Sequence, residues 1–101
     1  MAGHRVAFTA ELWEHEGTGA WHFVTLPEEA ADEVDALVAG RPKAGFGSVR
    51  VEVTVGRTTW ATSVFPDSKR ATYVLPVKKA VRVAEGLVAG GPVDVGLVVF
   101  T

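Results

Sequence analysis

Basic side chains gather where a second helix is predicted to begin, just after Pro76. Lys78 and Lys79 fall in its first turn, and Arg82 lies one turn beyond Lys78. Cations there oppose the helix dipole at a cost of roughly 0.3–1 kcal/mol each, whereas free N–H groups reinforced by basic side chains suit phosphate or carboxylate. These three residues are therefore candidates for a ligand site. The alternative is that they pair with Asp67 or with the acidic first helix, or only keep the surface soluble.

A second candidate segment runs from Trp60 to Asp67 and ends just before the turn that leads to the basic helix. Trp60 and Phe65 are possible walls of a ligand site, and Asp67 adds a carboxylate. The alternative is that the aromatic side chains serve as core packing. Ser63 lacks the Gly-x-Ser-x-Gly turn that exposes a nucleophile, so we expect an ordinary strand residue and predict no catalytic residue.

Metal and cofactor sites have little support in the sequence. Its three histidines form no HExxH motif, and there is no cysteine to supply a thiolate or a disulfide. A two-histidine site across His15 and His22 is geometrically possible but weakly indicated. The segment 45–47 precedes a strand and lacks the further glycine or lysine of a nucleotide-binding loop. We therefore predict neither a metal nor a cofactor.

Length and composition indicate one packed domain over residues 1–101. The chain is 48% hydrophobic and 22% charged, which is typical of a globular protein and not of a disordered segment. Its apolar runs are strand-sized and fall short of the ~20 residues that a membrane-spanning helix needs. The start of the chain lacks the basic-then-apolar pattern of a secretion signal. We expect a cytoplasmic protein that does not enter membranes.

The charge is distributed unevenly along the chain. Residues 1–40 hold one base, Arg5, against eight acids, whereas residues 41–82 hold nine bases against two acids, Glu52 and Asp67. This asymmetry indicates either attraction between the two segments or contact of the basic segment with an acidic partner. The pI of about 5.9 lacks the basic balance of a nucleic-acid binder. We therefore predict attraction between the segments and regard nucleic acid as an unfavoured partner.

Periodicity predicts six strands and two helices. Apolar residues alternate with polar ones in the strands, which are expected at residues 4–14, 21–24, 49–55, 58–65, 71–75 and 93–99. Proline in the first turn and glycine at the end delimit the helices, which are expected at 27–40 and 76–90. Turns are expected at 16–19, 56–57 and 66–68. The apolar helix faces are predicted to contain Ala30, Val34, Leu37 and Val38, and Val77, Ala80, Val81, Ala84 and Val88.

The two helical segments are near-repeats. Each begins with Leu-Pro, at Leu26 and Leu75, and each ends with Leu-Val-Ala-Gly, at Gly40 and Gly90. The order ββαβββαβ with duplicated halves predicts a mainly β, closed six-stranded barrel with pseudo-twofold halves, capped by two short helices, because closure removes exposed strand edges. An open α+β sandwich is the alternative.

Three runs of residues resemble the bacterial family of unknown function DUF 1905. They are 45–51, 63–67 and 73–82, the last containing Leu-Pro-Val-Lys-Lys-Ala-Val-Arg, and 21–27 also matches its N-terminal part. The resemblance implies a small double-split β-barrel with capping helices, a fold class that also contains swapped-hairpin DNA-binding regulators. It implies no activity, because none is assigned to the family.

The sequence leaves three functions in order of preference. The first is a non-enzymatic module that binds a small anionic or amphipathic ligand near Lys78, Lys79 and Arg82. The second is a dimeric, antitoxin-like or regulator-like protein that associates with nucleic acid. The last is an enzyme that uses the barrel interior as a hydrophobic reaction chamber. Exposure of Val98 or Phe100 on the last strand would favour a homodimer.

Overall fold

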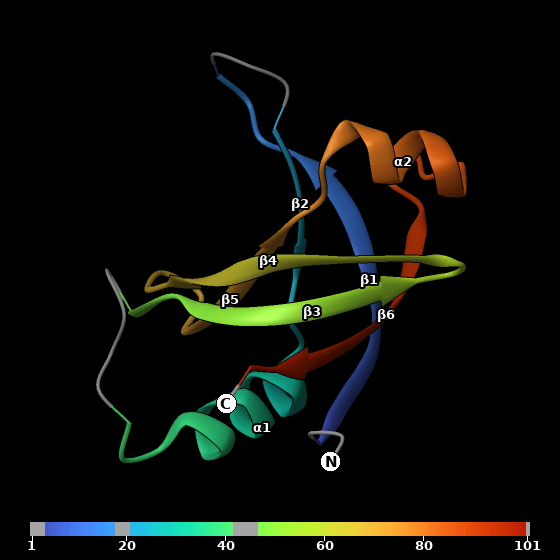
Figure 1. Cartoon of the computed structure of the whole chain (residues 1–101). Coiled ribbons are helices and arrows are strands. Elements are labelled where there is room, and N and C mark those ends of the chain that lie inside the picture. The colour runs from blue at the N-terminus through green and yellow to red at the C-terminus, as the bar shows by residue number, and fades with distance from the viewer. Residues whose placement is uncertain (1–3, 18–20, 42–46, 101) are drawn as a thin grey trace.

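The computed structural model describes residues 4–17, 21–41 and 47–100 (Figure 1). Parts of the predicted 16–19 turn and 45–47 loop lie outside these residues. The helices and strands follow the predicted order. They are β1 (Arg5–Glu14), β2 (His22–Thr25), α1 (Glu28–Val38), β3 (Val49–Val55), β4 (Thr58–Asp67), β5 (Thr72–Pro76), α2 (Lys79–Glu85) and β6 (Pro92–Val99).

The six strands form a closed antiparallel barrel in the order β1-β2-β5-β4-β3-β6, which confirms the predicted fold class. Closure depends on the two longest strands, which each change partner midway. β1 pairs with β6 as far as Glu11 and with β2 from Leu12 onward. β4 pairs with β3 as far as Val64 and with β5 from Phe65 onward. Each long strand thus joins both halves of the barrel, and its backbone N–H and C=O groups are paired along its length.

The predicted duplication appears in the strand pairing. Exchanging β1 with β4, β2 with β5 and β3 with β6 maps every pairing of the barrel onto another pairing of the barrel. α1 follows β2 as α2 follows β5, and Figure 1 shows the two helices on opposite sides of the barrel. The halves are therefore related by a pseudo-twofold exchange.

Aliphatic side chains fill the barrel interior. In β3 the valines at 49, 51, 53 and 55 are buried while Arg50 and Glu52 are exposed, as the alternating pattern predicts. Leu12, Leu75 and Leu97 are fully buried in the same cluster. The space that a hydrophobic reaction chamber would need is occupied by these side chains.

The first helix is shorter than predicted. Pro27 is its N-cap rather than its first residue, and the helix ends at Val38 instead of Gly40. Its buried face consists of Ala30, Ala31 and Val34, whereas Leu37, predicted on the apolar face, is 36% exposed. Along the part of the chain that the structure describes, neither helix is long and apolar enough to cross a membrane.

The second helix departs further from the prediction. It ends at Glu85, because Gly86 adopts a left-handed conformation with φ of 63° and its N–H bonds to carbonyls of the last turn, which is a helix-terminating geometry that glycine adopts without strain. The prediction that it continues to Gly90 is wrong. Ala80, Ala84 and Val88, predicted on its apolar face, are exposed, and of its seven residues only Val81 is buried.

The predicted turn at 66–68 begins too early, because β4 continues through Pro66 and Asp67. Pro66 pairs with Tyr73 and Asp67 pairs with Thr72. The chain then turns through residues 68–71.

Attraction between the acidic and basic segments is not expressed as ion pairs. The three pairs formed within residues 4–17, 21–41 and 47–100 are His4–Glu33, His22–Glu14 and Arg70–Asp67, and none joins one segment to the other. Any attraction between the segments therefore acts over longer range, where solvent screens it.

Tyr73 joins β5 to α1. Its side chain is buried, and its hydroxyl donates a hydrogen bond of 2.6 Å to a carboxylate oxygen of Asp35. Burial disfavours the charged phenolate, and the neighbouring carboxylate repels it. Together they raise the pKa of Tyr73 to about 12.

Tyrosinate absorbance can measure this shift directly, because Tyr73 is the single tyrosine of the chain. We expect a midpoint of about 12 in the folded protein and of ~10 in concentrated urea. The pKa is raised on folding, so the stabilisation is complete below pH ~10 and is lost as the pH rises toward 12. Tyr73→Phe should flatten the fall in stability over this range. A folded-state midpoint near that in urea, with circular dichroism still native, would contradict the assignment.

Glu85 fastens the end of α2 to the turn between β3 and β4. Its carboxylate accepts a hydrogen bond of 2.7 Å from the Thr58 hydroxyl and one of 3.3 Å from the Arg57 N–H. Gly56, in the same turn, has φ of 58°, and a Cβ placed on it would fall on this carboxylate.

Gly56→Ala should therefore destabilise the protein in two ways. The left-handed conformation alone costs an L-residue about 1–2 kcal/mol, and displacement of Glu85 adds to this. Gly90→Ala is the matched control, because Gly90 has φ of 91° with nothing near its missing Cβ. Urea denaturation should show a larger loss for Gly56→Ala than for Gly90→Ala, and equal losses would show that the Glu85 contact contributes nothing.

Candidate functional site

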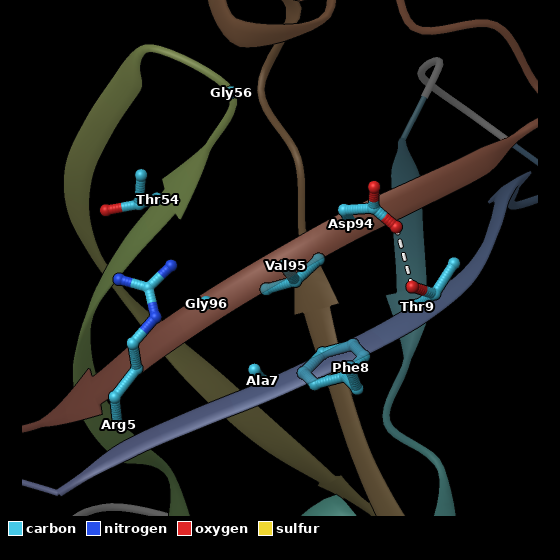
Figure 2. Close-up of a pocket in the computed structure, with 9 residues that line it drawn as sticks. All are labelled: Arg5, Ala7, Phe8, Thr9, Thr54, Gly56, Asp94, Val95 and Gly96. Carbon is cyan, nitrogen blue, oxygen red and sulfur yellow. Dashed lines mark hydrogen bonds between the residues drawn. The ribbon is translucent and has the colours of Figure 1, made fainter.

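A groove of about 450 Å³ lies on the outer surface of the barrel where β1, β6 and β3 run side by side (Figure 2). It is formed by side chains that face away from the core, by the adjoining strand backbone and by the start of the β3–β4 turn. Its lining residues are Arg5, Ala7, Phe8, Thr9, Thr54, Gly56, Asp94, Val95 and Gly96.

The groove exists because one row of the sheet has almost no side-chain bulk. In β6, Val95 and Leu97 are buried in the core, so Asp94 and Gly96 belong to the opposite, outer face. Gly96 pairs with Ala7 on one side and with Thr54 on the other. A residue without a side chain, flanked by two small ones, leaves a hollow across three strands.

Arg5 covers this hollow. A Cβ placed on Gly96 would fall on the Arg5 guanidinium, and Gly96 is buried although it faces outward. Figure 2 shows the Arg5 side chain extending from β1 toward Thr54. No acidic side chain of the described residues forms an ion pair with Arg5. The groove thus presents an uncompensated cation with the planar donor geometry that suits carboxylate and phosphate.

Asp94 supplies a negative charge at the other end of the groove (Figure 2). One of its carboxylate oxygens accepts a hydrogen bond of 2.6 Å from the Thr9 hydroxyl, and within the described part of the chain it forms no ion pair. On the opposite wall, the Thr54 and Thr59 hydroxyls are hydrogen-bonded at 2.9 Å. The groove combines a cation, an anion and hydroxyl groups, which is the chemistry of polar ligand recognition.

The basic residues predicted from the sequence lie elsewhere. Lys78 is the N-cap of α2 and Lys79 its first residue, and both side chains are exposed. Arg82 is half-buried, donates through Nε to the Val77 carbonyl at 3.2 Å, and has Nη1 3.5 Å from His22 Nε2. Arg82 is therefore partly used to hold the start of its own helix. Anion binding by these residues stays a prediction.

The aromatic candidates do not face one site. Trp60 pairs with the buried Val53 and packs against the core, whereas Phe65, five positions along β4, is 43% exposed. Residues an odd number apart in a strand point to opposite faces. Trp60 and Phe65 therefore cannot wall the same ligand site, and neither lines the groove.

Asp67 organises the turn after β4. It accepts hydrogen bonds from the Lys69 and Arg70 N–H groups at 3.1 and 3.3 Å, and its other oxygen is 2.7 Å from Arg70 Nη1. The bond from the Arg70 guanidinium is the main cause that lowers the pKa of Asp67. The same guanidinium lies 5.4 Å from the centre of the Trp13 ring. Asp67 thus has a structural partner at each oxygen and does not line the groove.

The two histidines considered as metal ligands have different surroundings. The His15 ring packs near Trp13 and Phe23 with ring centres 6.5 and 6.4 Å away, whereas His22 Nε2 lies 4.0 Å from a Glu14 carboxylate oxygen. Within the described residues, no three histidine, cysteine or acidic side chains are grouped so that they could hold a metal ion.

Sequence reasoning did not single out the residues of the groove, although weak signals were present. Arg5 is the one base among the first 40 residues, and Gly96 and Asp94 stand on the polar side of the last apolar strand. What the sequence could not indicate is that Arg5 and Gly96, at opposite ends of the chain, become neighbours through the β1–β6 pairing.

Comparison with known proteins gives one match. The family model described as a domain of unknown function, DUF1905, matches residues 8–97, so that Thr9, Thr54, Asp94 and Gly96 lie inside the matched segment and Arg5 precedes it. No curated protein matches the chain.

Proposed function

The chain belongs to the DUF1905 family, a domain of unknown function, and on that premise we propose that it is a non-enzymatic module that binds a small anionic ligand in the groove of Arg5. The observation that carries this proposal is the Arg5 guanidinium, which lies in a groove over Gly96 without an acidic partner among the described residues. An arginine held over bare backbone can offer two parallel N–H donors to one carboxylate or phosphate group.

The size and lining of the groove support a small ligand. Its volume of about 450 Å³ is within the range of roughly 300–1,000 Å³ that small-molecule sites occupy. The hydroxyls of Thr9 and Thr54 can add hydrogen bonds, and Ala7 and the Gly96 backbone leave the floor open. Because the groove is open to water, the charge–charge attraction is screened, and we expect weak binding that is best followed by NMR.

Binding rather than catalysis is supported by the kinds of side chain present. The nine lining residues include no histidine, lysine, serine or cysteine, which are common bases and nucleophiles of enzymes. The lining is instead an arginine, an aspartate, two threonines and small or apolar residues, which fit positioning of a bound molecule.

Titration of the labelled protein with inorganic phosphate and with acetate tests the proposal. We expect shifts of the Arg5, Ala7 and Gly96 amides that saturate with ligand. Arg5→Gln should weaken binding about tenfold or more, because a charge-assisted hydrogen bond contributes ~1.5–3 kcal/mol. Gly96→Val should also block binding by filling the floor.

The double variant Lys78→Ala with Lys79→Ala is the matched control, since it removes two exposed cations outside the groove. It should leave the titration unchanged. The opposite pattern, in which shifts centre on residues 78–82 and Arg5→Gln binds normally, would place the anion at α2 and overturn the groove as the site.

A further inference from the structure

We propose that the ligand of the groove is a zwitterion, an amino acid or a compound of similar size, whose acid group pairs with Arg5 and whose ammonium group pairs with Asp94. This inference rests on the proposed function, because it extends the same site to a second, oppositely charged contact. It is carried by the position of both charges in one groove without an ion pair between them.

The spacing of the two charges suits a short ligand. The Arg5 guanidinium lies at Gly96, and Asp94 stands two residues away on the same face of β6. Two residues of a strand span about 6.6–7 Å. A molecule whose carboxylate and ammonium are separated by one to three carbon atoms can lie over the bare backbone between them and reach both partners.

Asp94 has the capacity to accept from such an ammonium group. The Thr9 hydroxyl donates to Oδ1, which fixes the direction of the carboxylate, and no hydrogen bond to Oδ2 is formed within the described residues. An ionised carboxylate can accept several hydrogen bonds. The Thr9 contact therefore orients the group without exhausting it.

The same carboxylate selects against other anions. A ligand with a second negative group, such as a dicarboxylate, would bring that group toward Asp94 and be repelled. A simple monocarboxylate would use Arg5 and leave Asp94 with water. A zwitterion is the class that satisfies both ends of the groove.

A ladder of matched compounds tests this class by NMR titration. Glycine, β-alanine and γ-aminobutyrate are compared with acetate, propionate and butyrate, which have the same chains without the amine. We expect at least one zwitterion to bind about tenfold more tightly than its partner, the gain of one charge-assisted hydrogen bond. Succinate should bind no better than the monocarboxylates.

Variants separate the two contacts. Asp94→Asn keeps the size of the side chain and an oxygen for Thr9, and it should abolish the preference for zwitterions without weakening the plain carboxylates. Asp32→Asn, an equal charge change at an exposed position of α1, should preserve the preference. Arg5→Gln should weaken both series of compounds.

The outcomes distinguish the two proposals. Equal, Arg5-dependent binding of zwitterions and plain carboxylates overturns the zwitterion inference and leaves the anion site intact. A preference for zwitterions that survives in Asp94→Asn also overturns it. Absence of Arg5-dependent binding for every compound overturns the proposed function itself.

Discussion

Partner exchange by the two longest strands is the constraint on which the barrel depends. β1 and β4 each leave one neighbour and join another midway, at Leu12 and Phe65. Backbone groups that are removed from water must be paired, and the two exchanges provide this pairing all around the barrel. Near the first exchange the Leu12 carbonyl accepts from the Gly90 N–H and the Leu12 N–H donates to the Gly91 carbonyl. The loop that follows α2 is thereby bound to β1.

The same arrangement creates the groove on the outside of the barrel. β6 is held between β1 and β3, so its outward residues meet side chains from both. Where the outward residue is Gly96, the neighbours Ala7 and Thr54 are brought together across bare backbone, and Arg5 can lie over them. The interior is filled with aliphatic side chains, so recognition of a polar ligand is left to the outer surface.

Strand positions were largely predictable because each strand has one buried face and one solvated face, and this alternation is local in the sequence. The ends of the helices were less predictable. Proline and glycine signals marked Pro76 and Gly90 correctly as boundaries of a segment, but Gly86 inside that segment ended α2, because a left-handed residue there closed the helix first. The predicted cations at 78, 79 and 82 consequently lie on a single short helix, and the arginine is partly bound to backbone.

By itself, the sequence determined the fold class, the order of elements and the duplication of the halves, since apolar periodicity and the repeated Leu-Pro and Leu-Val-Ala-Gly signals act over short stretches of chain. Only the tertiary structure decided which charges share a surface. Arg5 and Asp94 are 89 positions apart in the printed sequence, and strand register alone places them at the two ends of one groove. Contacts of that kind arise from pairing between distant segments, for which the local pattern of residues carries no signal.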